Sequence, residues 1–390
     1  MRKMKKLKDV CVKFDDGDWI ESKDQSESGI RLIQTGNIGE GEFLEKTERT
    51  KYISEDTFER LKCEEVFSGD ILVSRLPEPI GRACIIPFKT EKMITAVDCT
   101  ICRVNEKVIR KEYLCYFMQS SAYYNQLKTK VTGTTRKRIS RKNLGNIDLP
   151  ILKLEDQDKI IRKLDCIKNI IYLKKKEILL LDNLIQSRFV EEFGDLKINP
   201  KKWKIKTFDE MTDLITDGEH ATPRRTEEGI FLLSARNIMN HTIKLEDVDY
   251  IDQAEYDRIS KRIHPKEGDV LISCSGTVGR CCSVPAELKF QMVRSVALLR
   301  FKNEINPIFA EYMITSDYLK EQIDRSKTQS SQANLFQGKI KKLKGFVPPI
   351  DLQNQFAAFV QQVNKSKFEV QKSLEKTQLL FDSLMQEYFG

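Results

Sequence analysis

The sequence predicts an α+β fold, in which two tandem mixed α/β domains are each followed by a long helix with a coiled-coil stripe. Three observations lead to this prediction. Short motifs recur about 200 residues apart, each copy contains several short strand-like runs, and each copy ends in a long apolar stripe with helical spacing. Solenoid repeats recur every 20 to 50 residues or so, so this longer period indicates a duplicated domain.

The two copies align through short motifs. Asp16-Gly17-Asp18-Trp19 returns as Asp217-Gly218-Glu219-His220, and Gly69-Asp70-Ile71-Leu72 returns as Gly268-Asp269-Val270-Leu271. Both copies also stop at a Phe-Gly pair. The alignment predicts four segments, namely a first domain at 1–154, a central long helix at 155–197, a second domain at 198–351 and a C-terminal long helix at 352–390.

Length and composition are those of a globular protein. A chain of 390 residues is long enough for two domains with separate cores, and a net charge of +8 makes a polyanionic partner plausible without requiring one. The basic start lacks the apolar stretch of a signal peptide, and no uncharged apolar run approaches the roughly 18 residues of a membrane span. We therefore expect a soluble, cytoplasmic protein without a membrane partner, whose ten cysteines are reduced thiols.

Within each copy the strand-like runs come before the helices. Ile71-Leu72-Val73 and Val270-Leu271-Ile272 are typical strands, bounded by Gly, Pro and Asp turns. A helical stretch follows in each copy, Lys111 to Lys128 and Pro307 to Arg325, and then an irregular polar segment.

Each copy ends in a stripe of apolar residues spaced alternately by three and four, a pattern typical of a coiled-coil seam. Lys174 is the one skipped position of the first stripe, and Ser366, Ser373 and Thr377 weaken the middle of the second. At about 1.5 Å per residue each helix is roughly 57 Å long, and the simplest partner for its apolar face is the other helix. Alternatively, each stripe covers only its own domain. The predicted pairing residues are Ile160, Leu164, Ile167, Ile171, Ile178, Leu181, Ile185, Phe356, Phe359, Val363, Val370, Phe381 and Leu384.

The duplicated body, the proline-containing lead into a Gln-bearing helix start and the Phe-Gly endings together resemble the specificity subunit of a type I restriction-modification system. The resemblance covers essentially the whole chain. The family's Thr-Pro turn is present at Thr222-Pro223, whereas the first copy lacks it. Gly133-Thr134-Thr135 also resembles the family pattern.

The resemblance implies a non-catalytic DNA-recognition subunit, in which two target-recognition domains are joined by two long antiparallel coiled-coil helices with pseudo-twofold symmetry. It implies as partners double-stranded DNA, two methyltransferase (modification) subunits and motor-endonuclease (restriction) subunits. No cofactor is expected in this chain, since S-adenosylmethionine, ATP and Mg would be used by the partners. A coiled-coil adaptor that binds other proteins without sequence-specific DNA binding is the alternative.

Two domains with shared scaffold residues and different loops can read two unlike half-sites at a fixed separation. Domains on the same face of B-DNA lie about one helical turn apart, roughly 34 to 36 Å. Two turns would exceed the expected helix length. We therefore expect a split, asymmetric target with a spacer on the order of 6 base pairs.

Loop residues able to contact DNA occur in both copies. Arg and Lys suit guanine and phosphate, Gln and Asn suit adenine, and an aromatic ring can stack on a base. Solvated loops, or a Trp19 packed into its own domain, are the alternatives. The candidates are Trp19, Arg136, Lys137, Arg138, Arg141 and Lys142 in the first copy, and His220, Thr222, Arg224, Arg225, Arg236, Lys327, Gln329, Ser331, Gln332 and Asn334 in the second.

Residues shared by the two copies suit structural roles better than base recognition. Asn37 and Asn237 are expected to form turns, and Arg82 and Arg280 are expected to be structural or to contact the DNA backbone. Different residues at aligned positions are the better candidates for reading different bases.

Catalytic and metal motifs are weak or missing. Cys99 and Cys102 have metal-ligand spacing, but the second copy has Val296 and Leu299 there, so we expect buried thiols and no metal site. Asp269 with Glu287-Leu288-Lys289 loosely resembles a nuclease motif that the first copy does not repeat. The sequence contains neither a Walker A motif nor the Asn-Pro-Pro-aromatic motif of adenine methyltransferases.

Overall fold

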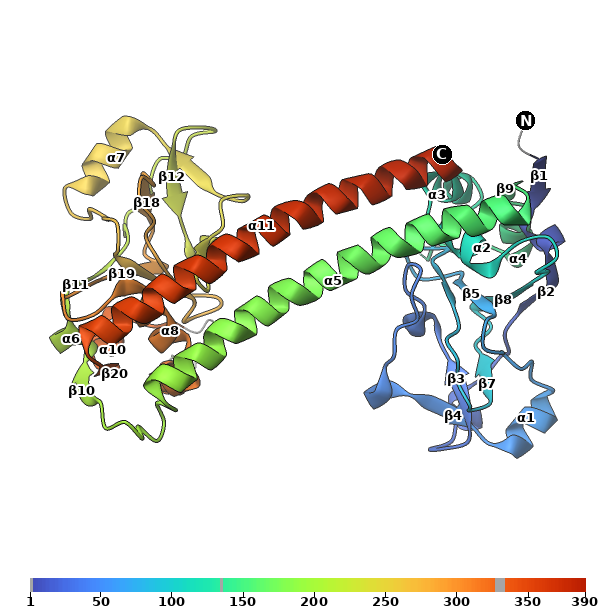
Figure 1. The fold of residues 1–390 in the computed structure, drawn as a ribbon, viewed down its shortest axis with the longest axis horizontal. Coiled ribbons are helices and arrows are strands. Elements are labelled where there is room, and N and C mark those ends of the chain that lie inside the picture. Colours follow the sequence, from blue (N-terminus) through green and yellow to red (C-terminus); the bar gives the residue numbers. More distant parts are fainter. Residues whose placement is uncertain (1–2, 134–135, 327–333) are drawn as a thin grey trace. The chain divides into compact units, whose positions relative to one another are not determined.

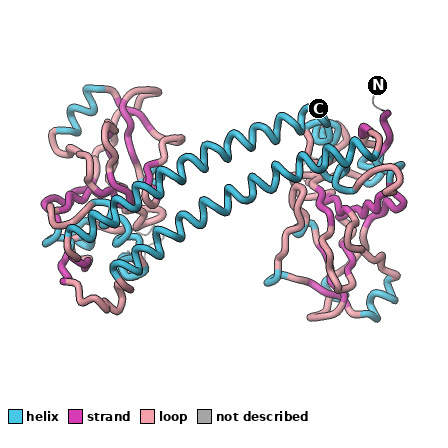
Figure 2. The backbone as a smooth tube through the Cα atoms, viewed as in Figure 1, coloured by secondary structure: helices cyan, strands magenta, loops and turns pink. Residues whose placement is uncertain are grey.

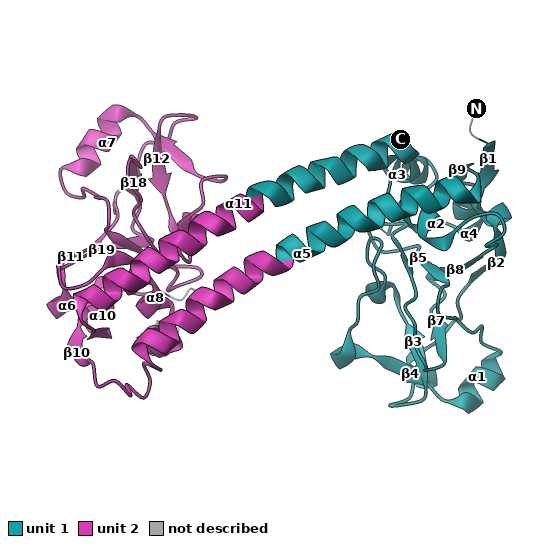
Figure 3. Cartoon of the chain, in the orientation of Figure 1, with its two compact units in different colours: residues 1–175, 372–390 teal, residues 176–371 magenta. Residues whose placement is uncertain are grey.

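The computed structural model describes residues 3–133, 136–326 and 334–390 (Figure 1). The contacts divide the chain into unit 1, Met1–Lys175 with Lys372–Gly390, and unit 2, Lys176–Gln371 (Figure 3). Each unit contains a body of short strands and helices together with parts of both long helices (Figure 2). Because this division cuts through the helices, the four segments expected from the sequence remain a prediction.

The body of unit 1 is built on three sheets. A four-stranded antiparallel sheet has the order β2-β8-β5-β6, a three-stranded sheet has the order β4-β3-β7, and β1 pairs with β9. The strands are β1 (Lys3–Lys6), β2 (Cys11–Asp16), β3 (Ile30–Ile33), β4 (Lys51–Ile53), β5 (Ile71–Ser74), β6 (Ala83–Ile85), β7 (Met93–Thr95), β8 (Cys99–Val104) and β9 (Asp148–Ile151). The short α-helices are α1 (Glu55–Leu61), α2 (Lys111–Phe117), α3 (Ser121–Lys128) and α4 (Arg141–Gly145).

Unit 2 repeats the arrangement with the orders β11-β19-β16-β17, β15-β12-β18 and β10-β20, and adds the small hairpin β13-β14. The strands are β10 (Lys204–Thr207), β11 (Thr212–Asp217), β12 (Ile230–Leu233), β13 (Ile238–Met239), β14 (Thr242–Ile243), β15 (Asp249–Ile251), β16 (Val270–Ser273), β17 (Cys281–Ser283), β18 (Phe290–Met292), β19 (Val296–Phe301) and β20 (Lys344–Val347). The short helices are α6 (Phe208–Met211), α7 (Gln253–Ser260), α8 (Pro307–Thr315), α9 (Asp317–Ser326) and α10 (Gln337–Ile340). The duplication predicted from the sequence is therefore a duplication of topology.

The helical stretch predicted after the strands is two helices in each unit, so its continuity was wrong. In unit 1 the Ser120 hydroxyl accepts a hydrogen bond from the Tyr123 N–H and starts α3. In unit 2 Ser316 adopts an extended conformation between α8 and α9. Serine competes for backbone hydrogen bonds, which explains why each helix is interrupted there.

The long helices are α5 (Leu154–Phe193) and α11 (Ile350–Phe389), each an uninterrupted run of 40 residues. In unit 1 the start of α5 and the end of α11 belong to one apolar core, for example Leu164 with Phe389. In unit 2 the end of α5 and the start of α11 share a core, for example Phe193 with Phe356. Within each unit the two helices therefore run antiparallel, as the family resemblance implied.

The predicted pairing positions on both helices are all buried or half-buried. Lys174, the skipped position, donates to the Ser373 hydroxyl over 2.8 Å, so two polar residues meet where both stripes are interrupted. No helix within residues 3–133, 136–326 and 334–390 is both long and apolar enough to cross a membrane.

Candidate nucleic-acid interface

The aligned Asp-Gly turns end β2 and β11 in the same way. The Gly17 N–H donates to the Cys99 carbonyl, and the Gly218 N–H donates to the Val296 carbonyl, both over 2.9 Å. A Cβ at Gly17 would lie 2.3 Å from the carbonyl oxygen of Thr95, and one at Gly218 would meet the same kind of clash. The backbone contact therefore requires glycine, and it places the residues that follow at equivalent points.

Trp19 and His220 occupy those equivalent points. Trp19 is 70% exposed, so the interpretation that it packs into its own domain is wrong. The His220 side chain is 62% exposed, and its Nε2 lies 3.8 Å from Asp217 Oδ2. Both rings are accessible to a ligand, and their contact with DNA remains a prediction.

The predicted basic segment of unit 1 is exposed at each described position, including Arg136, Arg138 and Lys142. Lys137 Nζ lies 3.1 Å from Glu78 Oε1, and Arg141 Nη1 lies 2.8 Å from Asp15 Oδ1. Exposed pairs of this kind are weak and can be exchanged for other anions. The segment can therefore offer several cations to a phosphate backbone.

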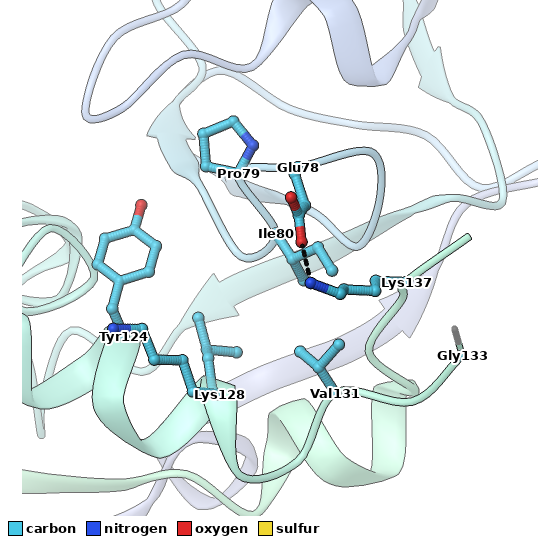
Figure 4. Close-up of a pocket in the computed structure, with 9 residues that line it drawn as sticks. Glu78, Pro79, Ile80, Tyr124, Lys128, Val131, Gly133 and Lys137 are labelled. Atoms are coloured by element: carbon cyan, nitrogen blue, oxygen red, sulfur yellow. Dashed lines mark ion pairs between the residues drawn. The ribbon is translucent and has the colours of Figure 1, made fainter. Parts of the chain in front are cut away.

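A cavity of about 640 Å³ lies beside this segment (Figure 4). Pro79 and Ile80 border it from one loop, Tyr124 and Lys128 border it from α3, and the ion pair between Glu78 and Lys137 crosses it. The pair connects the loop after β5 to the basic segment.

In unit 2 the predicted arginines are exposed but paired with acids. Arg225 and Arg236 both contact Asp249, at 2.9 and 2.8 Å, and Arg224 Nε lies 3.8 Å from Glu255 Oε2. Their charges are thus partly neutralised. Thr222, beside them, is exposed.

The remaining candidates in unit 2 belong to one polar segment. Lys327, Gln329, Ser331 and Gln332 lie outside the described residues. Asn334 forms an isolated antiparallel bridge with Ser275 and lines a cavity of about 390 Å³. The other residues lining this cavity are Asp217, His220, Cys274, Ser275, Arg294, Ser295, Leu335 and Phe336.

Sequence reasoning identified His220 and Asn334 on this cavity and missed the others. A signal existed, because Cys274 aligns with Arg75, a large charged residue, at a position next to the shared strand motif. The alignment of unlike residues beside like ones indicated the place where the two units differ.

The residues shared by both units have structural partners. Asn37 donates to the Leu44 carbonyl and Asn237 to the Lys244 carbonyl, which confirms their predicted role in turns. Arg82 donates to backbone carbonyls including those of Ile38 and Thr35, as a structural arginine does. The predicted role of Arg280 is untested, and its guanidinium lies 3.2 Å from the Met239 sulfur.

The cysteine prediction concerned burial. Cys99 and Cys102 are both fully buried in β8, which confirms that they occupy core positions. Burial raises the pKa of the Cys99 thiol to about 12, so at neutral pH it is protonated. In the part of the chain that the structure describes, no three His, Cys, Asp or Glu side chains are grouped as metal ligands.

Comparison with known proteins decides the family. The family described as Type I restriction modification DNA specificity domain matches the chain twice, over residues 2–183 and 200–379. The chain belongs to this family. The two matched ranges correspond to the two copies found in the sequence, so the suspected resemblance is confirmed.

One similar protein is the type I restriction enzyme MjaVIII specificity subunit of Methanocaldococcus jannaschii, which is 26% identical over 175 residues. The matching part spans 44% of this chain and 40% of that relative. A crystal structure of the type I restriction-modification S subunit from M. genitalium covers 100% of this chain and 96% of its own, with 13% identity and a TM-score of 0.59. A chain from a study of complex assembly and conformational transition of the type I R-M system covers 99% and 97%, with 16% identity and a TM-score of 0.60. These likenesses establish the fold.

Proposed function

We propose that this chain is the DNA sequence-recognition subunit of a type I restriction-modification complex. Each body reads one half of a split, asymmetric duplex target, and the long helices set the separation of the halves. The supporting observation is that one backbone framework is present twice with different residues at equivalent loop positions, such as Trp19 and His220. Two readers on one framework suit two unlike half-sites.

The chemistry belongs to partners in this proposal. Two methyltransferase subunits would use S-adenosylmethionine to modify one adenine in each half-site, and motor-endonuclease subunits would use ATP and Mg. This chain would itself carry no catalytic group and bind no cofactor. Its contribution is to bind duplex DNA and fix where the partners act.

Co-expression with the neighbouring methyltransferase gene, followed by long-read mapping of methylated adenines, tests the proposal. The expected result is one bipartite motif with two unlike halves and a constant gap, on the order of 6 base pairs. A contiguous motif, or a motif whose gap varies freely, would contradict the proposal. Absence of any motif when the partner alone is expressed is the control.

Salt dependence is a second test. If exposed cations such as Arg136 and Lys142 displace counterions from the phosphate backbone, the affinity falls steeply with ionic strength. Binding is measured on a fixed duplex between about 50 and 200 mM salt. A response that is flat across this range would contradict phosphate binding by the basic segment.

A further inference from the structure

One pair of equivalent carboxylates has different surroundings in the two units. Asp16 ends β2 and is opposite Thr100 of β8, and Asp217 ends β11 and is opposite Ala297 of β19. Hydrogen bonds outside the sheets also align, because Ile139 donates to the Arg75 carbonyl as Leu335 donates to the Cys274 carbonyl. Arg75 and Cys274 are therefore structural equivalents.

In unit 1 Asp16 is surrounded by donors. The Thr100 hydroxyl donates to Oδ1 over 2.9 Å, and Arg75 Nη2 lies 3.3 Å from Oδ2. The same guanidinium donates to the carbonyls of Val97 and Ile139. Arg141 Nε is a further cation, 4.0 Å from Oδ2. The Asp16 carboxylate is therefore occupied by contacts within unit 1.

In unit 2 each of these donors has been replaced or redirected. Ala297 occupies the position of Thr100, and Cys274 occupies the position of Arg75. Gln337, at the start of α10 as Arg141 is at the start of α4, donates instead to the Ile215 carbonyl. Among the described residues no side chain donates a hydrogen bond to the Asp217 carboxylate, and His220 Nε2, which is charged only when protonated, lies 3.8 Å from Oδ2.

The missing arginine leaves space as well as an unused acceptor. The cavity of about 390 Å³ is lined by Asp217, and Cys274 lies where Arg75 lies in unit 1. Burial raises the pKa of Asp217, and interactions with His220 and Arg262 oppose this shift. Within the described ranges no side-chain donor replaces the water that the carboxylate has lost. A carboxylate in such a site favours a ligand that supplies hydrogen-bond donors.

A positively charged side chain lines the same cavity as the Asp217 carboxylate. Arg294 is exposed and lines the same cavity, where unit 1 has the uncharged Val97 at the equivalent position before the strand. In the major groove a C·G pair presents the N4 amino donor of cytosine beside the O6 and N7 acceptors of guanine. The Asp217 carboxylate can accept from the cytosine amino group, and the Arg294 guanidinium can donate to the guanine acceptors.

We propose that the cavity of unit 2 reads a C·G base pair, with Asp217 accepting from cytosine N4 and Arg294 donating to guanine. This inference rests on the proposed function, since it assigns a base pair to one body of a DNA-recognition subunit. The corresponding space in unit 1 is occupied by the Arg75 guanidinium, so unit 1 reads its half-site with other residues. Asp217 is thus a specificity-determining residue.

The test uses the full-length chain, purified together with the methyltransferase subunit of its own system. The complex is incubated with duplexes randomised across both halves of the mapped target, and bound duplexes are sequenced. D217N has nearly the same shape as the wild type but replaces a charged acceptor with an amide. It should reduce selection for C·G at one position of one half-site by about 5- to 150-fold, and leave the other half-site unchanged.

C274R is the second variant, and it does not alter the carboxylate itself. It introduces the arginine of unit 1, which should pair with Asp217, fill the cavity and abolish selection at the same position. E287Q removes an exposed acid of unit 2 that does not line the cavity, and it should leave the selected motif unchanged.

The possible results distinguish a failure of the role assigned to Asp217 from a failure of the proposed DNA-recognition function. If the wild-type complex enriches a bipartite motif and both D217N and C274R enrich that same motif, the assignment of Asp217 is overturned while the proposed function stands. If the wild-type complex enriches no sequence, the proposed function fails and the assignment fails with it. A loss of selection at the same position in both variants supports the assignment.

Discussion

The two units share a framework but differ in the residues that line the cavity of unit 2 and in those that fill the corresponding space in unit 1. In both, an arginine of the central strand makes a two-point contact with a buried aspartate, Arg103 with Asp70 and Arg300 with Asp269, at 2.7 to 2.9 Å. The carboxylates at the strand ends have different surroundings. Asp16 contacts the Thr100 hydroxyl and the Arg75 guanidinium, whereas in the described part of unit 2 no side chain donates a hydrogen bond to Asp217. The comparison teaches that duplication has kept the residues that hold the strands and changed those that face the cavity.

A second difference lies where each body meets the long helices. In unit 2 Glu311 accepts from the Ser283 N–H, and His241 Nδ1 lies 2.9 Å from the same carboxylate. In unit 1 the equivalent positions are Cys115 and Gly41, and the Cys115 sulfur accepts from the Ile85 N–H. The same backbone N–H is satisfied by an acid in one unit and by a thiol in the other.

The largest expected effect tests whether the two helix ends are equivalent. Phe193 and Phe389 are the last residues of α5 and α11, and both are almost fully buried in aromatic clusters. Each substitution to alanine should cost about 3 to 5 kcal/mol, since it leaves a cavity in a packed core. F193A should lower hydrogen-exchange protection in unit 2, and F389A should lower it in unit 1.

The comparison breaks down if one of these variants lowers protection equally in both units. That result would mean that the units unfold as a single cooperative block and that each helix end stabilises both. L379A is a matched control on α11, since Leu379 is 69% exposed and should tolerate truncation with little loss.

The second prediction sharpens the difference at Glu311. E311C should cost about 2 to 3 kcal/mol, because His241 loses the acid it contacts while the Ser283 N–H retains only a weak sulfur acceptor. The double variant H241G/E311C recreates the pair found in unit 1, and glycine suits position 241, whose φ is +65°. The double variant should therefore be more stable than the sum of the single changes predicts.

Denaturant unfolding of the four proteins gives the coupling energy, expected between about 0.5 and 3 kcal/mol. Additive effects would show that the histidine and the glutamate are independent. G41H in unit 1 is the reverse change, and it should destabilise for two reasons. A Cβ at position 41 would lie 2.3 Å from the Gln119 side chain, and Cys115 offers a histidine no acid at the position of Glu311.

Replacing the two strand-end aspartates, Asp16 and Asp217, by asparagine should change the stability of the protein in opposite directions. D16N should destabilise by about 1 to 2 kcal/mol, since the Arg75 guanidinium loses its anionic partner. D217N should instead raise the melting temperature at neutral pH, because burial raises the pKa of Asp217 and ionisation of this group is unfavourable in the folded state.

The pH dependence follows from that raised pKa. Folding is favoured by the protonated carboxyl below the ordinary aspartate pKa of about 3.9, and this contribution is lost as the pH rises through the higher folded value. The advantage of D217N over the wild type should therefore shrink as the pH falls toward that range. Destabilisation of the protein by D217N at pH 7 would contradict the account.

Much of the fold could be predicted because its signals are periodic or repeated. The stripe from Ile160 to Ile185 defines a helix by spacing alone, and the repeated Asp-Gly turns define two equivalent bodies. The break at Ser120 was missed, because a serine within an otherwise helical pattern signals a new helix only through its hydrogen bond to the Tyr123 N–H.

The candidate site was less predictable, since its geometry depends on residues far apart in the sequence. The contact of Arg75 with Asp16 joins residues that are far apart in the sequence, and no local sequence pattern reveals it. The exposure of Trp19 also depends on the whole body, because an aromatic residue in a loop can be buried or exposed. Only the duplication gave a hint, through unlike residues at aligned positions.

The smallest expected effect compares two polar contacts between the long helices, one in each unit. In unit 2 Lys367 Nζ lies 2.5 Å from Asp182 Oδ1, with side chains 35% and 49% exposed. In unit 1 Lys174 is half-buried and contacts the neutral Ser373. K367Q should cost less than about 1 kcal/mol, an effect that high salt diminishes, because water and ions screen an exposed pair. K174L should be neutral or stabilising at any salt, since it completes the apolar seam, and a loss of helix stability with K174L would show that the lysine is needed to pair the helices.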